Sequence, residues 1–169
     1  MGTIKEVSQR IAEINLRLTA DLQQLLQDNA ALAVEMVGEQ HEAGLDGYGQ
    51  PLTPSYLDDP YFNDTAHPQV AARNYIQWKE RITPPQTTWR LMLPPRAPET
   101  PNLRINGYYR RTISATPISG GLRIGTDDML GGAVTAKYGD DRLYKLGIEA
   151  RTYIAEEIVM PYLRQLFGK

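Results

Sequence analysis

The sequence predicts an α+β fold with a long N-terminal helix, a small and mostly antiparallel β-sheet with a central hairpin, and a C-terminal amphipathic helix. Apolar residues recur every three or four positions near both ends of the chain, which is typical of amphipathic helices. Two runs rich in β-formers flank a glycine turn in the second half, which is typical of a hairpin. With 169 residues, of which 41% are hydrophobic, the chain is long enough for one core, and we expect a single domain over residues 1–169.

The first helix is predicted from about Thr3 to Val37. Thr3 and Glu6 have the spacing of a capping box, and Gly38 is a typical C-terminal stop. At 1.5 Å per residue this helix is roughly 50 Å long, more than a domain of this size covers alone. We therefore expect part of its apolar stripe to contact another chain. The alternative is a long helix laid across the chain's own sheet.

The middle of the chain is predicted to contain two segments without regular structure. Residues 38–68 form a Gly-, Pro- and Tyr-rich arm whose aromatic side chains are expected to dock on another surface. A second helix is expected from Pro68 to the residues before Pro84, with His67 as a helix-start residue. Residues 87–93 read as a strand, and the Pro-rich connector at about 94–101 reads as an extended spacer.

The second half carries the hairpin and two further helices. Residues 111–118 and 121–125 are predicted to pair around Ser119 and Gly120, because glycine permits the positive φ of a tight turn. A short helix is expected over Ala133–Tyr138 and another strand over 148–154. The last helix is expected over 155–167, with a kink at Pro161.

Composition excludes several classes of protein. The chain has no cysteine, so disulfides, thiolate nucleophiles and cysteine zinc sites are all excluded. Its net charge of -2 disfavours bulk binding of nucleic acid. It has neither a secretory signal nor an apolar run long enough for a bilayer, so we expect a soluble protein made in the cytoplasm, without a membrane partner.

Few residues have the spacing that catalysis requires. His41 and His67 lack metal-ligand partners at helical spacing, and no acidic pair has an evident nucleophile beside it. We therefore expect no enzyme activity, no cofactor and no metal site. The alternative from another class is a metal-dependent hydrolase that uses Asp127, Asp128 and Asp141.

Charge is distributed unevenly along the chain. Residues 1–72 carry a net charge of -8 and residues 73–111 a net charge of +6. This asymmetry favours a head-to-tail interface in which the acidic edge of one subunit meets the basic edge of its neighbour. The alternative is that both segments are solvated faces.

One cluster of cationic and aromatic residues is predicted to form a subunit or partner interface, together with the acidic and apolar residues that follow the hairpin. The predicted interface consists of Tyr108, Tyr109, Arg110, Arg111, Asp127, Asp128, Met129 and Leu130. We predict that Arg110→Glu leaves the fold intact but disturbs assembly. A regulator that binds nucleic acid through Arg110 and Arg111 is the alternative.

Three short motifs follow one another from Gly47 onward. The first is Asp46-Gly-Tyr-Gly-Gln-Pro-Leu-Thr-Pro-Ser-Tyr56, and the second is Leu103-Arg-Ile-Asn-Gly-Tyr-Tyr-Arg-Arg-Thr-Ile113. The third combines Leu122-Arg-Ile-Gly-Thr-Asp127, the Ala133–Gly139 stretch and Ala150-Arg-Thr-Tyr153 before a last amphipathic helix. Their order resembles that of the tail-completion and head-tail joining proteins of tailed bacteriophages, the virion-morphogenesis type. The departures are Asn106 for Thr, Tyr109 for Leu, Thr152 for Pro, and an enlarged middle at about 60–101.

The resemblance implies a noncatalytic structural protein of the virion. Such a protein is an α+β subunit of a homo-oligomeric ring in the neck, between the capsid portal and the tail. Its partners would be copies of itself and the portal, neck and tail proteins, with DNA only passing through the channel. Its location would be the virion, after assembly in the bacterial cytoplasm. A tail terminator or minor tail protein is the alternative that the same motifs allow.

Overall fold

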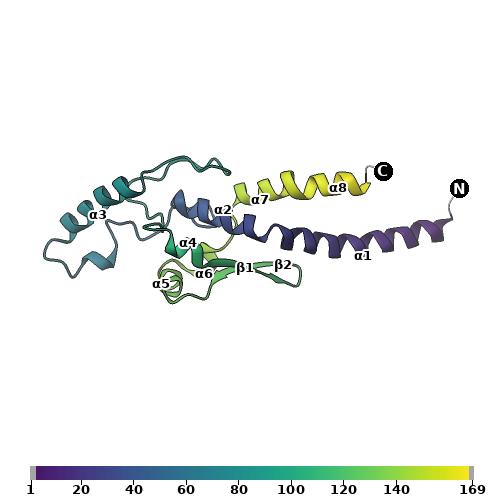
Figure 1. Ribbon diagram of the computed structural model, residues 1–169, viewed down its shortest axis with the longest axis horizontal. Coiled ribbons are helices and arrows are strands. Elements are labelled where there is room, and N and C mark those ends of the chain that lie inside the picture. The colour runs from purple at the N-terminus through teal and green to yellow at the C-terminus, as the bar shows by residue number, and fades with distance from the viewer. Residues whose placement is uncertain (1–2, 168–169) are drawn as a thin grey trace.

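A pair of helices projects from a mixed body (Figure 1). The computed structural model describes residues 3–167. Helix α1, Ile4–Asp28, runs beside the C-terminal helical segment, to which it is joined by a 2.7 Å hydrogen bond from the Tyr162 hydroxyl to the Asp21 carboxylate. Helices make up 57% of the chain and the sheet has two antiparallel strands, so the α+β class is confirmed.

The N-terminal helix begins as expected, but the predicted single helix is two helices, the second of which extends beyond Val37. The Thr3 hydroxyl accepts from the backbone N–H of Glu6, whose carboxylate in turn accepts from the backbone N–H of Thr3, which completes the capping box. The helix is interrupted at Asn29, and the chain continues as helix α2, Ala30–Glu42. The predicted stop at Gly38 is therefore wrong.

The end of α2 is set by a different glycine. Gly44 has φ +68°, and the backbone N–H groups of Gly44 and Leu45 donate to the carbonyls of His41 and Gln40. This pattern is a Schellman motif, which requires a left-handed residue just past the helix. Gly38 serves packing instead, because a Cβ there would lie 2.6 Å from the Arg110 Nε.

The predicted hairpin is confirmed. Strands β1, Ile113–Ile118, and β2, Gly121–Thr126, pair antiparallel around Ser119 and Gly120, and Gly120 has φ +80°. Arg111 lies in α4, Tyr108–Thr112, rather than in the strand. The expected helix at 133–138 begins earlier, as α5, Met129–Tyr138, because the Asp128 carboxylate accepts from the N–H groups of Leu130 and Gly131.

The core lies between α2, the hairpin and the short helices around it. After α5 the chain forms α6, Asp140–Leu143, which lies against α5. The central buried residues come from six separate segments: Val37, Leu52, Tyr109, Ile113, Tyr138, Leu143 and Tyr144. Because α2 supplies the first of them and contacts β1, it is the element around which the body packs.

The arm docks on the second helix of the same chain. The short helix η1, Pro60–Phe62, is followed by α3, Pro68–Ile82, whose N-cap is His67. The Tyr56 and Phe62 rings are buried and lie 5.0 and 5.5 Å from the Tyr75 ring of α3. The expected helix start at His67 is confirmed, and two of the arm's aromatic residues, Tyr56 and Phe62, pack on its own chain.

The predicted strand at 87–93 is wrong. The backbone N–H of Thr88 donates to the Leu93 carbonyl at 3.1 Å, and Met92 has φ +52°, so the chain reverses direction within the segment. The Pro-rich connector then wraps around the buried guanidinium of Arg96. Its Nη1 donates to the carbonyls of Ala97, Pro98 and Thr100, so these three backbone acceptors of the connector have hydrogen-bond partners.

The C-terminal segment is helical throughout. The predicted strand at 148–154 is wrong, because these residues form α7, Ile148–Ile154, with Ala150 fully buried and α7 in contact with α2. A π-helical turn, η2, Ala155–Val159, joins it to α8, Met160–Phe167. Pro161, where the sequence predicts a kink, directly follows this turn in α8; proline clashes with the carbonyl four residues before it, and a wider turn gives it room. In the part of the chain that the structure describes, no helix is both long and apolar enough to cross a membrane.

Candidate functional site

The two segments of the predicted interface lie next to each other. Helix α4 contacts α5, and the Tyr108 hydroxyl donates to the Asp128 carboxylate at 3.0 Å. Met129 and Leu130 stand at the start of α5 with exposed fractions of 91% and 50%, and Asp127 is also exposed. The surface around Tyr108 and α5 is thus available for contact with another molecule.

Tyr109 belongs to the core. Its side chain is buried, it stacks on His41 with ring centres 6.0 Å apart, and its hydroxyl lies 3.1 Å from that of Tyr144. The Tyr144 hydroxyl in turn lies 2.9 Å from that of Thr135. Burial, reinforced by the hydrogen bond to Tyr144, raises the pKa of Tyr109 far above that of a free tyrosine. Tyr109 therefore packs the body and does not present its ring to a partner.

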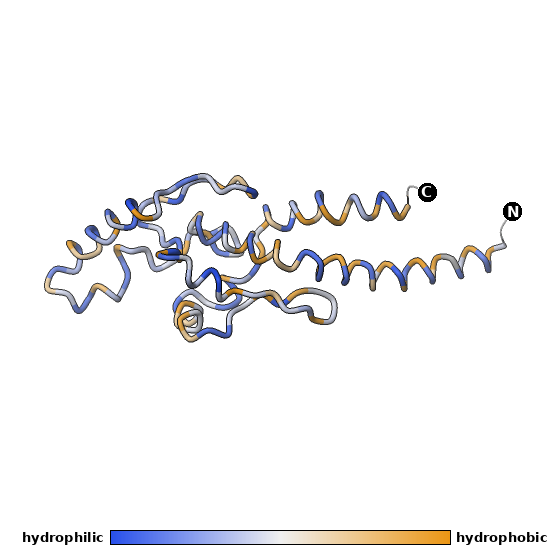
Figure 2. The backbone as a smooth tube through the Cα atoms, viewed as in Figure 1, coloured by the Kyte–Doolittle hydropathy of each residue, from blue (hydrophilic) through white to orange (hydrophobic). Residues whose placement is uncertain are grey.

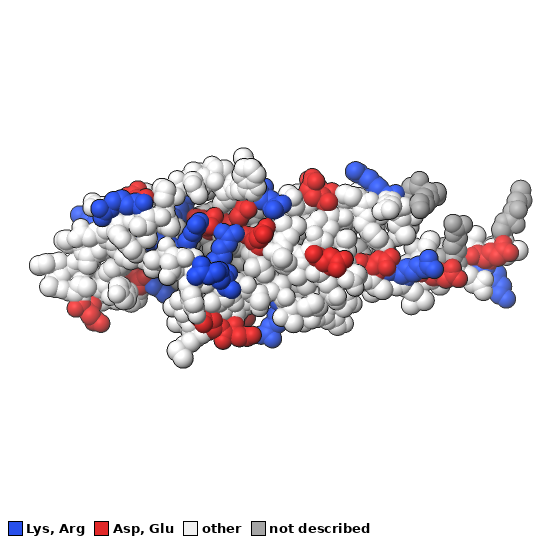
Figure 3. All heavy atoms as spheres, viewed as in Figure 1, with Lys and Arg blue, Asp and Glu red and all other residues white. Residues whose placement is uncertain are grey.

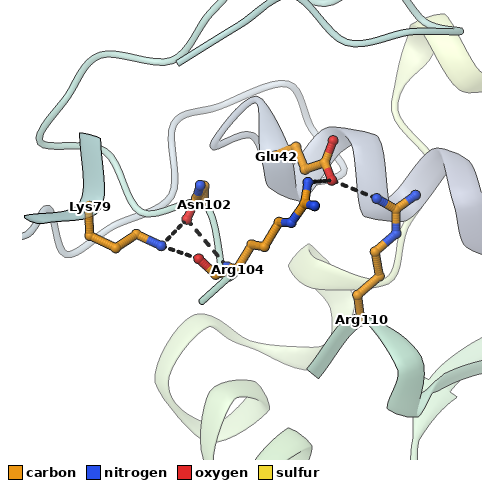
Figure 4. A network of polar contacts seen from close by, with 5 residues as sticks. All are labelled: Glu42, Lys79, Asn102, Arg104 and Arg110. Atoms are coloured by element: carbon orange, nitrogen blue, oxygen red, sulfur yellow. Dashed lines mark hydrogen bonds and ion pairs between the residues drawn. The ribbon is translucent and has the colours of Figure 1, made fainter. Parts of the chain in front are cut away.

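Arg110 forms an ion pair within its own chain, with the Glu42 carboxylate that also binds Arg104. Its Nη1 donates to Glu42 Oε1 at 2.6 Å, and the Nη1 of Arg104 donates to the same oxygen at 2.8 Å (Figure 4). Beside them the buried Lys79 ammonium donates to the Asn102 side-chain oxygen and to the Arg104 carbonyl. Of the predicted cationic pair, only Arg111 is largely exposed.

The charge asymmetry of the sequence is used within one chain. In residues 3–167 every ion pair joins a carboxylate of residues 1–72 to a cation that follows residue 72. The pairs are Glu35–Arg90, Glu42–Arg104, Glu42–Arg110, Asp46–Arg142 and Asp59–Lys137. Figure 3 shows cationic and acidic side chains together over the middle of the body. These opposite charges hold the arm and α2 to the second half of the same chain, and the head-to-tail charge contact between subunits stays a prediction.

The carboxylates of the hydrolase hypothesis do not converge. Asp128 is occupied by the α5 N-terminus and by Tyr108. Among the described residues no group of three His, Asp or Glu side chains is placed to hold a metal ion. His41 is buried, and its Nε2 donates to the Leu143 carbonyl at 3.0 Å. Desolvation lowers the pKa of His41 to about 4, so the imidazole is neutral at pH 7.

A run of exposed apolar side chains lies along the free end of α1. Ile4, Val7 and Ile11 have exposed fractions of 88%, 53% and 57%, and we call these three residues the stalk stripe. Figure 2 shows that apolar positions recur along the whole helix. Toward the body the same stripe becomes half-buried against the C-terminal helices. The sequence had indicated this excess of apolar helix surface.

One exposed apolar site was missed by the sequence reasoning. Trp89, placed in a predicted strand, is 87% exposed at the tip of the 88–93 loop, and Met92 beside it is 69% exposed. A tryptophan between two proline pairs was the available signal, because proline favours loops over sheet interiors.

Comparison of this chain with protein-family models, curated proteins and solved structures gives no significant match.

Proposed function

We propose that this protein is a noncatalytic structural subunit of a tailed bacteriophage particle that assembles into a homo-oligomeric ring joining the capsid portal or neck to the tail. The observation that carries the proposal is the stalk stripe. Three large aliphatic side chains stand in solvent on one face of a helix that projects from the body. Contiguous exposed apolar surface of this kind marks a site of association.

The spacing of the stripe favours a helical contact between copies. Ile4, Val7, Ile11, Ile14 and Leu18 alternate steps of three and four residues, which is the a/d pattern of a coiled coil. β-branched residues occupy both kinds of position, and this arrangement favours assemblies of more than two helices. A ring whose projecting helices pack side by side would bury the stripe.

The partners follow from the resemblance of the three motifs to the head-tail joining family. They are copies of this chain, the portal or other neck proteins, and tail proteins, with DNA passing through the channel. The near-neutral charge supports this role, because a strongly basic lumen would retain phosphates. The location would be the virion, reached from the bacterial cytoplasm during assembly. A tail terminator or minor tail protein fits the same surfaces.

The test is the state of association of the purified full-length chain. Sedimentation and negative-stain electron microscopy over a wide concentration range should show a concentration-dependent, closed oligomer. Replacing Val7 and Ile11 together by Asp should abolish it, since charges at the seam cannot be paired there. Gln9→Asp, on the opposite face of the same helix, is the matched control and should assemble normally. A chain that remains monomeric at every concentration contradicts the proposal.

A further inference from the structure

The loop over residues 88–93 is held rigidly at its base. The Glu39 carboxylate, 6% exposed, accepts from the backbone N–H of Arg90 at 3.0 Å and from that of Leu91 at 2.9 Å. The Arg90 guanidinium lies over the Tyr153 ring of α7 and donates to its hydroxyl at 3.1 Å. A buried carboxylate that orders two backbone amides fixes the loop in one conformation.

Although the backbone of this loop is held in place, two of its large apolar side chains are exposed to solvent. Trp89 and Met92 are the most exposed large apolar residues of the segment, and Met92 adopts φ +52°, a left-handed conformation that costs a non-glycine residue free energy. Strain held by surrounding contacts is typical of functional positions. An exposed, pre-organised tryptophan is a typical binding anchor, because little entropy is lost when it docks.

A pocket of matching character lies on the other side of α7. Its volume is about 280 Å³, and its apolar walls are formed by Leu26, Ala33, Leu122, Ile124, Ile154 and Ile158. An apolar cavity of about 150 Å³ is large enough to bind benzene, so this pocket has room for an indole ring.

The loop and the pocket do not meet within one chain, because Trp89 is exposed and no residue of the loop lines the pocket. Tyr153, which contacts the loop through Arg90, and the pocket residues Ile154 and Ile158 lie on different faces of the same helical segment. In Figure 1 the segment between α3 and α4 reaches toward the beginning of α7. A contact between a projection and a distinct pocket on identical chains is heterologous, and such a contact generates a ring when its rotation closes.

The charges beside the two features are complementary. Glu149, Tyr153 and Glu156 follow one another at steps of four and three along the loop-side face, and both glutamates are exposed. Glu35 beside Arg90 is also acidic, with its side chain 56% exposed. The pocket, by contrast, is bordered by the cations of Lys145 and Arg151. Opposite charge around an apolar anchor favours the docking of one copy on the next.

We propose that the Trp89 side chain of one copy inserts into the pocket between α2, β2 and α7 of a neighbouring copy, with Met92 packed at the pocket's edge. This inference rests on the proposed function, which requires several copies to associate, and it names the contact that sets their head-to-tail order.

Tryptophan fluorescence tests the contact directly. The chain has two tryptophans, so Trp78→Phe leaves Trp89 as the only reporter. As concentration rises and oligomers form, Trp89 emission should move to shorter wavelength and acrylamide quenching should fall. Trp89→Ala should raise the dissociation constant about tenfold or more. Tyr61→Ala, which removes another exposed aromatic ring, is the control and should leave it unchanged.

Cross-linking supplies an independent readout, because the chain has no native cysteine. Mixed chains carrying Met92→Cys and Leu122→Cys should be joined by a short bismaleimide, and chains carrying Tyr61→Cys and Leu122→Cys should not. Oligomers in which Trp89 stays accessible to acrylamide and Met92→Cys is not cross-linked overturn this inference and leave the proposed function standing. A chain that never associates overturns both.

Discussion

Arg110 is constrained on two sides by α2. Its guanidinium pairs with Glu42 at 2.6 Å and packs over Gly38, where no side chain intervenes. The sequence alone predicts that Arg110→Glu leaves the fold intact. With the carboxylate of Glu42 in contact, the structure changes that expectation.

We predict that Arg110→Glu lowers the free energy of unfolding by about 1–2 kcal/mol, because it places two carboxylates together at a half-buried site. Urea denaturation measures the change. Arg111→Glu, at an exposed position, should shift stability by less than about 0.5 kcal/mol. Adding Glu42→Gln to Arg110→Glu should recover part of the loss, and equal stability of the two single variants would contradict the argument.

His41 makes stability depend on pH. Its pKa is lowered to about 4 in the folded chain, chiefly by burial, with the Arg110 charge acting in the same direction. The unfolded chain binds this proton near pH 6.5, so it holds more protons than the folded chain between pH 6.5 and 4. Stability therefore falls as the pH falls through this interval.

We predict that acidification from pH 7 to 4 costs the natural chain up to about 3 kcal/mol more than it costs His41→Gln. Glutamine retains a donor for the Leu143 carbonyl but has no proton to gain. Denaturation curves across this pH range give the difference. His67→Gln, at the exposed start of α3, serves as the control, and identical pH profiles for the natural chain and His41→Gln would refute the prediction.

At the scale of the element, α5 contains two adjacent glycines with different surroundings. A Cβ on Gly131 would lie within 3.0 Å of three Thr126 side-chain atoms, whereas a Cβ on Gly132 would meet nothing within 4 Å. The first glycine is required by packing against β2. The second only reduces the helical preference of the segment.

We predict that Gly131→Ala destabilises the protein by about 1–3 kcal/mol through overpacking and that Gly132→Ala stabilises it by about 0.5–1 kcal/mol. Thermal and urea unfolding of the two variants provide a matched comparison on one helix. The same sign of change in both would show that α5 does not pack on β2 as described.

At the scale of the whole molecule, association through the stalk stripe links stability to concentration. Only folded chains can present the stripe, so binding between copies shifts unfolding by mass action. We predict that Tm rises with protein concentration for the natural chain and for Gln9→Asp, and is constant for the variant with Asp at positions 7 and 11. Scanning calorimetry at several concentrations measures this. A constant Tm for all three chains would mean that the stripe joins no copies.

The sequence by itself determined the elements whose signals are local. The capping box at Thr3, the proline-started helix at 68–82 and the glycine hairpin at 119–120 each depend on backbone groups a few residues apart, so neighbouring residues suffice to specify them. The excess of apolar surface on α1 followed from its length and spacing.

Only the tertiary structure decided the rest. Residues 148–154 have a pattern that fits strand or helix, and burial of Ala150 against the body selects the helix. Gly38 lies within a helix and is a glycine because Arg110, distant in sequence, occupies the space that a side chain would need there. Folding brings Glu42 of the acidic segment next to Arg110 of the basic segment, so these charges pair within one chain. Folding also brings the Glu39 carboxylate to the backbone N–H of Leu91, which holds the loop that exposes Trp89. Contacts between residues far apart in the chain set these outcomes, and composition and periodicity do not contain them.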